Sequence, residues 1–289
     1  MTLFQHIGII GRYGDSPIQS TIKHITELLE EHGIRITYDA RTLPYMPQAI
    51  PCEAWEGVDL VLTVGGDGTF LSAGRAVAGR GIPIVGVNTG RLGYLADIAV
   101  ENLDRQLREI LHGQYTQEER GLLRVEVERV GEEIKRFQVV NDVVIHKRHM
   151  ARMIELDVYH RAHYLCHYRA DGLIISTPTG STAYAISAGG PLIEPTLPVH
   201  LLVPICPHTL NQRPMVIDRQ SALTVRLSKA SRDNIQITLD GQEELMLQSD
   251  DVVHIGAGDS FTVIHPIGYQ FQQRLRTKLN WGIAPEDSA

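Results

Sequence analysis

The stretch GGDGT, residues 65–69, separates an apolar run from a segment of mostly small residues. The run before it, DLVLTV at 59–64, is typical of a buried strand in a parallel sheet. The segment after it, 70–78, predicts a helix. Ligands of open α/β sheets bind where strands end and helices begin, so GGDGT predicts both a parallel α/β fold and a ligand site at this turn.

The residue types of this turn suit a phosphate group. Gly65, Gly66 and Gly68 let the backbone turn sharply and approach a ligand closely, and with Thr69 they form a candidate phosphate loop. The Asp67 carboxylate would repel a phosphate unless it has a task, and the simplest task is to accept a proton from a hydroxyl that attacks a phosphoryl group. The alternative is an ordinary strand-to-helix turn with Asp67 as N-cap.

Composition excludes several classes of protein. The chain has 289 residues with 43% hydrophobic and 21% charged residues, which is ordinary for a globular protein. Its net charge of −7 argues against non-specific nucleic-acid binding. Three cysteines without a CxxC pair suit a reducing compartment. There is no basic-then-apolar leader and no apolar run of about 18 residues, so we expect a cytoplasmic protein without membrane or nucleic-acid partners.

Strands and helices alternate through residues 1–119. Apolar runs at 6–10 and 82–87 and an alternating stretch at 34–38 predict strands, and helical spacing of apolar residues predicts a helix at 18–32. This alternation predicts a Rossmann-like parallel sheet domain. Glycine-bearing loops follow Val64 and Val87, and both should open on the same edge of the sheet. Asn88, which begins the second loop, therefore joins the candidate phosphate loop. We expect Asp97, farther along this loop, to begin a helix.

The pattern changes at about residue 120. Short stretches of alternating apolar and polar residues predict antiparallel strands, and Asp240-Gly241 is a hairpin turn signal. These features predict a mostly β domain, a layered β-sandwich, at 120–266. One of its strands should run from 134 to 146. The segment 269–281 predicts a C-terminal helix that returns to the first domain and, as part of 267–289, completes it.

A hydroxyl-rich segment, 171–191, interrupts this β pattern. A strand should end at Ser176, and a short helix should begin near Ser181. Ser181 or Thr182 could cap that helix and donate to a ligand, and Tyr184 could stack on a base. The alternative is a Gly/Ser/Thr loop with a capped helix and no ligand.

Four motifs resemble a known family when they are taken together. They are GGDGT, NTGRLG at 88–93, NDVVIH at 141–146 and the long segment 171–191. Their order and spacing resemble NAD kinases of the bacterial type over nearly the whole chain, and TKLNW at 277–281 is similar too. GGDG turns also occur in diacylglycerol, sphingosine and phosphofructokinases, whereas we associate the motif at 177–191 with NAD kinases only.

The resemblance implies transfer of the γ-phosphoryl of ATP to the 2′-hydroxyl of the adenosine ribose of NAD, which gives NADP. Asp67 would be the general base, and Mg²⁺ or another divalent cation would arrive with ATP. A homodimer or homotetramer would share site residues between copies. The implied nucleotide-binding residues are Asp67, Gly68, Asn141, Asp142, Arg152, Arg169, Asp171, Thr182, Ala183, Tyr184, Ser187 and Gln242.

The resemblance also implies a role for each of these groups. Asn141 and Asp142 would hold the ribose hydroxyls or the adenine edge, and Asp171 would accept from the nicotinamide amide. Arg152 and Arg169 would lie near the phosphates or the second nucleotide. The adenine pocket would be lined by Thr182, Ala183, Tyr184 and Ser187. Gln242 of a neighbouring subunit would make a further contact with the ligand.

Two other functions remain open. The same glycine turn could serve a lipid or sugar kinase, but no basic amphipathic stretch for a membrane surface is present. The second alternative is a protein that binds a dinucleotide as a sensor and catalyses no reaction. Asp67 argues against it, because a binding module gains nothing from a carboxylate beside phosphates. His160, His163, Cys166 and His167 are close in sequence, but their spacing matches no usual zinc site and we expect a polar hairpin.

Overall fold

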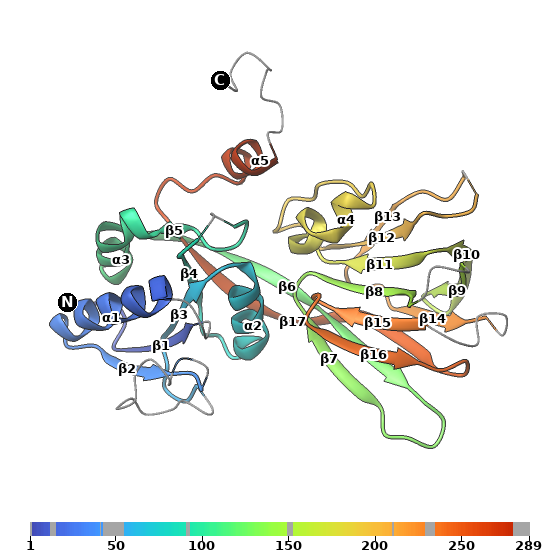
Figure 1. The fold of residues 1–289 in the computed structure, drawn as a ribbon, viewed down its shortest axis with the longest axis horizontal. Helices are drawn as coiled ribbons and strands as arrows, with labels where there is room; N and C mark the ends of the chain where they lie inside the picture. The colour runs from blue at the N-terminus through green and yellow to red at the C-terminus, as the bar shows by residue number, and fades with distance from the viewer. Residues whose placement is uncertain are drawn as a thin grey trace, which may run out of the picture. The chain divides into compact units, whose positions relative to one another are not determined.

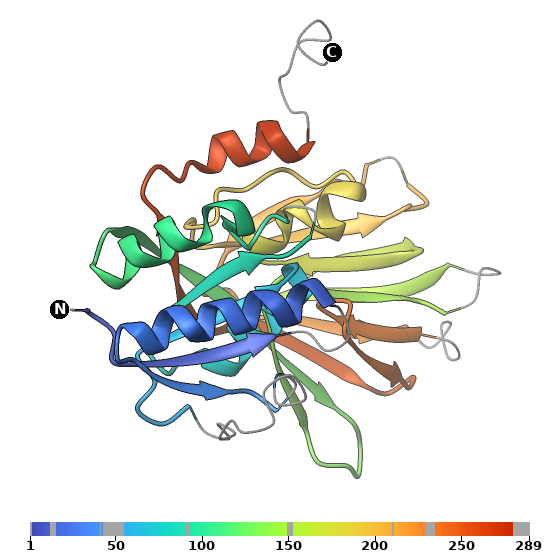
Figure 2. The same ribbon diagram turned by 60° about the vertical axis from the view of Figure 1, so that its left-hand side comes forward.

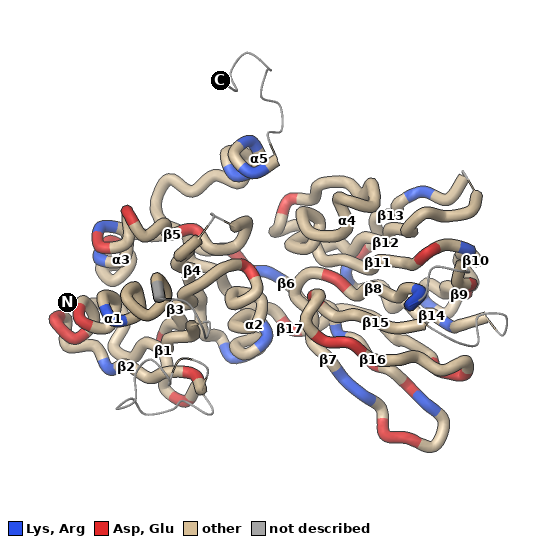
Figure 3. The backbone as a smooth tube through the Cα atoms, in the orientation of Figure 1, with Lys and Arg blue, Asp and Glu red and all other residues tan. Residues whose placement is uncertain are grey.

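The computed structural model describes residues 2–11, 16–40, 42, 55–90, 93–148, 153–209, 211–228 and 235–279. The chain forms two compact units, Met1–Glu119 with Phe261–Ala289, and Arg120–Ser260 (Figure 1). Charged residues of both signs occur in both units (Figure 3). Within the described part of the chain, no helix is long and apolar enough to cross a bilayer.

The first unit is a parallel sheet flanked by helices. Its sheet order is β17-β4-β3-β1-β2, with β5 beside β4, and every pairing among these strands is parallel. The predicted Rossmann-like class is therefore confirmed. The elements are β1 (His6–Gly11), α1 (Ser16–Glu31), β2 (Arg35–Tyr38), β3 (Leu60–Gly65), α2 (Asp67–Val77), β4 (Ile84–Asn88), β5 (Ile98–Ala99), a 3₁₀ turn at Val100–Asn102, α3 (Leu103–Leu111), the end of β17 (Val252–Pro266) and α5 (Phe271–Leu279).

Alternation along the strands assigns the helices to two faces of this sheet. Val85 and Val87 of β4 belong to a buried cluster that also contains the apolar faces of α1 and α3. Gly86, between them, faces the other way, where a Cβ would lie 3.0 Å from the Phe70 ring of α2. Thus α1 and α3 cover one face and α2 the other. Figure 2 shows α1 lying along the sheet.

The second unit consists of two packed layers of antiparallel strands. One layer has the order β13-β12-β11-β8-β15-β16, and the other contains β6, β7, β9, β10, β14 and the first half of β17. Its elements are β6 (Tyr115–Glu128), β7 (Lys135–Val139), β8 (Asp142–Lys147), β9 (Ile154–His160), β10 (His163–Ala170), β11 (Gly172–Ser176), a 3₁₀ turn at Thr179–Thr182, α4 (Tyr184–Ser187), β12 (Val199–Ile205), β13 (Met215–Asp218), β14 (Leu223–Leu227), β15 (Ile235–Leu239) and β16 (Glu243–Leu247).

One apolar cluster fills the space between the layers of this unit. It takes Val143 and Ile145 from β8, whereas Val144 between them belongs to a cluster on the outer face of the same sheet. Ala185 of α4 also belongs to this outer cluster. The hydroxyl-rich segment therefore packs on the outer face of the β8–β11–β12 sheet. The predicted β-sandwich is confirmed, as is the C-terminal helix of the first unit.

The predicted strand at 134–146 is wrong. The chain forms two strands there, β7 and β8, which pair in different layers. It breaks at Val140 and Asn141, whose N–H groups donate to the Asp240 carboxylate at 3.1 and 2.6 Å instead of to a neighbouring strand. A side chain 100 positions away causes this break, so local alternation could not predict it.

Candidate functional site

Two loops of the first unit open on one edge of its sheet, as predicted. Gly65 at the end of β3 pairs with Asn88 at the end of β4, so the loops that follow them begin side by side. Asn88 is buried, and its Oδ1 accepts a hydrogen bond from the Gly90 N–H at 2.8 Å. This side chain therefore shapes the start of the second loop from within.

Asp67 does not cap its helix. Helix α2 begins at Asp67, three residues earlier than predicted, its N-cap is Gly66, and no side chain caps it. The N-cap alternative is therefore wrong. Asp67 instead reaches across to the second loop, where its Oδ2 accepts from the Tyr94 N–H at 2.9 Å and its Oδ1 from the Leu95 N–H at 3.0 Å. Each oxygen retains lone-pair capacity for a further hydrogen bond.

The glycines around Asp67 leave the start of α2 open. Gly66 and Gly68 are exposed, and Asp67 and Thr69 are half-buried. A Cβ at Gly66 would meet nothing within 4 Å. Gly65 has a φ of 153°, and a Cβ there would lie 2.6 Å from the Thr69 hydroxyl. Among the described residues, no side chain lies over Gly66, and an accessible helix N-terminus of this kind is well suited to a phosphate.

The charges around Asp67 come from its own unit. Lys278 of α5 lies close enough to interact with this carboxylate, although burial and the nearby Arg274 together lower the pKa of Lys278. Burial raises the pKa of Tyr94, and the negative charge of Asp67 raises it further. Among the described residues, the Asp67 carboxylate thus has a neighbouring ammonium group and a phenol that stays protonated.

Asp97 does not begin a helix, contrary to expectation. It lies directly before β5, and its side chain is buried. Its carboxylate pairs with Arg274 of α5 and with His265 at the end of β17. Local sequence could not indicate this, because both partners lie more than 160 residues away.

In the second unit, Asn141 lies at the corner between β7 and β8. The carbonyl of Asn141 accepts from the Thr177 N–H at 2.9 Å and the Ser176 hydroxyl at 3.1 Å, and the Val140 carbonyl accepts from the Thr177 hydroxyl at 2.6 Å. A Cβ on Gly180 would lie 2.2 Å from the Asn141 carbonyl. The Asn141 Oδ1 is buried without a hydrogen-bond partner among the described residues, which indicates a ligand or water donor at this corner.

Asp142 connects the same corner to helix α4. It is 5% exposed, and its carboxylate accepts a hydrogen bond from the backbone N–H of Tyr184. Burial raises the pKa of Asp142 to about 7, Asp240 adds to the rise, and the Tyr184 hydrogen bond opposes it. The structure therefore brings together three predicted residues, Asn141, Asp142 and Tyr184, in one unit.

The hydroxyl-rich segment is built differently from the prediction. Ala183, not Ser181 or Thr182, is the N-cap of α4, and it makes no side-chain cap. Ser181 is fully buried and accepts from the Ile193 N–H at 3.1 Å, and Thr182 donates to the Thr179 carbonyl at 3.3 Å. Tyr184 is 47% exposed, so its ring is free to contact a ligand. Of the other predicted residues here, Ala183 is half-buried and Ser187 is exposed.

A second group of predicted residues lies at the other end of β8. Asp171 pairs with Lys147, and Arg169 lies 3.9 Å from a Glu155 oxygen. The ladder pairs Asp142 with Ser176 and His146 with Gly172, so this group is at least four residues, or about 13 Å, from Asn141.

Three residues of these sites were not predicted from the sequence. Asp240 was recognised only as part of a turn, and its turn is present, with positive φ at Asp240 and Gly241. The other two are Lys147 and Arg274, which had no sequence signal because their partners are distant in the chain.

Two predicted residues remain. Gln242 is exposed in the hairpin that contains Asp240. Arg152 lies outside the described residues. Within them, no group of three or more His, Cys, Asp or Glu could hold a metal ion, the histidine-rich hairpin included.

Comparison with known proteins gives the family. Residues 7–115 match a model of the ATP-NAD kinase N-terminal domain, and residues 140–265 match a model of the ATP-NAD kinase C-terminal domain. The chain belongs to the NAD kinase family. The members of this family are phosphotransferases, and the resemblance inferred from the motifs is confirmed.

Relatives of the chain span its full length. It is 39% identical to the NAD kinase of Pseudomonas entomophila (strain L48), over 98% of this chain and 97% of that protein. The NAD kinase of Chromohalobacter salexigens is 38% identical over 97% of this chain and 98% of that protein. Among solved structures, an Archaeoglobus fulgidus NAD kinase in complex with ATP is 25% identical with a TM-score of 0.71, covering 95% of this chain and 97% of that one. Yeast NADH kinase complexed with NADH shares the fold, with a TM-score of 0.87 at 20% identity. The match covers 97% of this chain and 89% of that one.

Gly93 tests the contact between Asp67 and the second loop. A Cβ at Gly93 would lie 2.1 Å from Asp67 Oδ1, so we expect Gly93→Ala to displace the carboxylate and to lower phosphoryl transfer at least tenfold. Gly90→Ala is the matched control, because a Cβ at Gly90 meets nothing within 4 Å. Initial rates of both variants measure the effect, and equal rates would contradict the assigned role of this contact.

Asp142 predicts a pH dependence of stability. Its pKa rises from 3.8 in the unfolded chain to about 7 in the fold, so the folded state retains the proton longer. Between pH 4 and 7 the unfolded state ionises first, and stability falls by on the order of a few kcal/mol. Asp142→Asn should lose this fall and gain stability over wild type at pH 8.

Urea unfolding at pH 4.5 and pH 8 measures this difference. The exposed Asp250→Asn is the control, and it should follow wild type at both values. A parallel pH response of wild type and Asp142→Asn would show that Asp142 is already ionised in the fold below pH 7.

Proposed function

We propose that this chain transfers the γ-phosphoryl of ATP to the 2′-hydroxyl of the adenosine ribose of NAD, which gives NADP and ADP. One observation carries the proposal: a carboxylate, Asp67, stands in the first turn of a helix whose glycines leave the backbone open to phosphate. We further propose that residues 1–119, completed by 267–289, bring the base and phosphate loop, and that residues 120–266 bind the dinucleotide.

In the proposed reaction Asp67 accepts the proton of the attacking hydroxyl. The ribose oxygen then forms a bond to the γ-phosphorus while the bond from that phosphorus to the bridging oxygen of ADP breaks. The backbone of Gly65, Gly66, Gly68 and Thr69 cradles the phosphates, and the N-terminus of α2 favours their charge. The two backbone N–H donors on Asp67 hold its carboxylate in one orientation, so it needs no rearrangement before it accepts the proton.

The corner at Asn141 supports the nucleotide-binding proposal. Its buried Oδ1 offers an acceptor to an exocyclic amine or a ribose hydroxyl. Asp142 beside it, with a raised pKa, can accept or donate near neutral pH. The half-exposed Tyr184 ring offers a stacking surface, with Thr182, Ala183 and Ser187 around it.

We propose that the active form is a homodimer or homotetramer in which copies share sites. Within one unit, Asp171 lies beyond the opposite end of β8 from Asn141, so a nucleoside held at Asn141 leaves Asp171 and Arg169 available to a ligand bound mainly by another copy. A second copy would supply Asp171, Arg169 or Gln242. Light scattering during gel filtration should therefore give two or four times the mass of 32.2 kDa, and a monomer with full activity would contradict sharing.

We propose that Mg²⁺, or another divalent cation, enters bound to the phosphates of ATP. Phosphate oxygens and waters supply most of the ligands of such a cation. The protein then needs to provide at most one or two oxygen ligands, and a cluster of three acidic residues is not required. The cation neutralises charge on the phosphates. We also propose a cytoplasmic location, consistent with Cys166 and Cys206 being free thiols.

The variant Asp67→Asn tests the general base. Asn removes the proton acceptor but keeps one oxygen for a loop N–H, so we expect kcat to fall by at least a hundredfold while NAD and ATP still bind. NADP formed from NAD, ATP and Mg²⁺ is measured with an NADP-specific dehydrogenase. Asp218→Asn is the control, because Asp218 is an exposed carboxylate that also accepts a backbone N–H.

The outcomes of this assay separate the functions. Activity of Asp67→Asn equal to wild type would exclude Asp67 as base. Nucleotide binding by a folded wild type that forms no NADP would favour the sensor, and phosphorylation of a lipid or sugar instead of NAD would favour the other kinases.

A further inference from the structure

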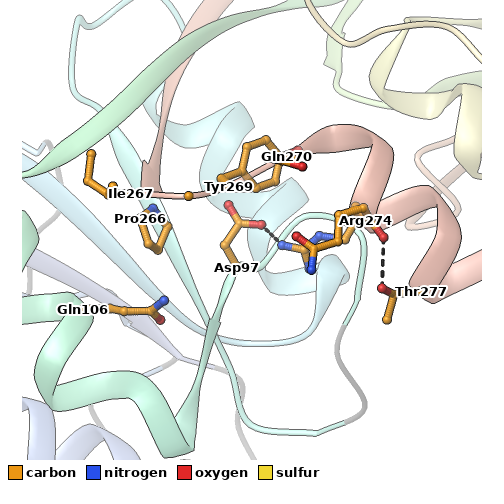
Figure 4. Close-up of a pocket in the computed structure, with 10 residues that line it drawn as sticks. Asp97, Gln106, Pro266, Ile267, Tyr269, Gln270, Arg274 and Thr277 are labelled. Carbon is orange, nitrogen blue, oxygen red and sulfur yellow. Dashed lines mark hydrogen bonds and ion pairs between the residues drawn. The ribbon is translucent and has the colours of Figure 1, made fainter.

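The loop that holds Asp67 is held on its other side by the C-terminal helix. The Tyr94 and Leu95 N–H groups donate to Asp67, and the carbonyls of the flanking residues Gly93 and Ala96 accept from Arg274 Nη1 at 3.1 and 3.4 Å. The second nitrogen of this guanidinium pairs with the Asp97 carboxylate (Figure 4). Residues 93–97 therefore lie between a carboxylate and a guanidinium.

Arg274 is unusual among the residues of α5. Its side chain is only 9% exposed, and with Leu275 it forms the buried part of this helix. Basic residues are frequent in α5 (Figure 3), but Arg276 is exposed to solvent. A buried guanidinium makes stronger and more directional hydrogen bonds than an exposed one, and its planar fork can bond several acceptors at once.

The acceptors of Arg274 are themselves fixed. His265 Nδ1 contacts the other oxygen of Asp97, and His265 Nε2 lies 3.2 Å from a Glu118 oxygen. Tyr269 stacks on the His265 ring with centroids 3.8 Å apart, and the Arg274 guanidinium lies 5.7 Å from the Tyr269 ring centroid. The guanidinium is thus anchored to the sheet through β17.

A pocket beside Arg274 shows how the loop is supported. It has a volume of about 340 Å³ and is lined by Asp97 and Arg274 together with Gln106, Tyr269 and Gln273 (Figure 4). Asp97 and Arg274 face this open space, whereas Leu95 and Ala96 are buried and the Asp97 N–H donates to the Gly86 carbonyl at 3.1 Å. The hydrogen bonds of Arg274 to Gly93, Ala96 and Asp97 therefore add a polar restraint to a loop that also packs against the core.

We propose that Arg274 is a positioning residue for phosphoryl transfer, which acts on Asp67 through the loop 93–97. This rests on the proposed function, because Asp67 must be the base. The two loop N–H groups orient the carboxylate, and a general base loses rate steeply when it is misplaced by about 1 Å. Arg274 does not itself bond to Asp67, so its loss should lower kcat and leave the KM values unchanged.

Two variants separate positioning from general stability. Lys in Arg274→Lys retains the ion pair with Asp97, but a single ammonium group cannot bridge this carboxylate and two carbonyls as the fork does. Arg274→Met loses both. The matched control is Arg276→Met, which removes an exposed arginine from the same helix. Thermal unfolding, kcat, and KM for NAD and ATP are measured for each, with amide hydrogen exchange at Tyr94 and Leu95.

The proposal predicts a distinct pattern for Arg274→Lys. Its unfolding temperature should stay near that of wild type, kcat should fall about tenfold or more, and both KM values should stay within about twofold. Amide exchange at Tyr94 and Leu95 should accelerate. Arg274→Met should lose stability as well as kcat, and Arg276→Met should match wild type.

Other results would overturn the proposal. Wild-type kcat in Arg274→Lys would limit Arg274 to folding, whatever Arg274→Met does. A raised KM for ATP with unchanged kcat would instead place Arg274 in substrate binding. Wild type serves as the reference for the reaction itself: if it forms no NADP the proposed function fails, whereas an active wild type beside an unimpaired Arg274→Lys refutes this inference alone.

Discussion

The hydrogen bonds between the Asp67 carboxylate and the N–H groups of Tyr94 and Leu95 are the constraint on which the first unit's site depends. They join the loops that follow two neighbouring parallel strands. The two loops begin side by side because β3 and β4 pair Gly65 with Asn88. The same side chain that we propose as the base is therefore also a structural link. Its orientation is set by backbone dipoles, which cannot move without moving the loop.

The second unit solves a comparable problem at the corner between β7 and β8. When the chain changes layer at Val140 and Asn141, two N–H groups and two carbonyls leave the sheet and need partners. Asp240 accepts from both N–H groups, and Ser176 and Thr177 donate to the carbonyls. A backbone satisfied in this way holds the Asn141 side chain with its Oδ1 buried and, among the described residues, without a hydrogen-bond donor.

Sequence patterns predicted the parallel and antiparallel classes correctly, because burial period and turn residues are local properties. They predicted that the loops after Val64 and Val87 open on one edge, since parallel strands require it. They failed where a group outside the local segment decides the conformation. The strand expected at 134–146 is interrupted where Asp240 binds the backbone. Ser181, expected to cap a helix, instead accepts from the Ile193 N–H, and the Asp97 carboxylate pairs with Arg274.

The sequence by itself determined the family, the two fold classes and the type of each candidate group, because motif order and residue chemistry are written along the chain. Only the tertiary structure decided what those groups touch. It showed that Asp67 binds a loop and does not cap α2, that Asp142 is buried enough to have a raised pKa, and that Arg274 supports residues 93–97. The physical reason is that hydrogen bonding and desolvation depend on neighbours in space, and here those neighbours lie 27 to 181 residues apart.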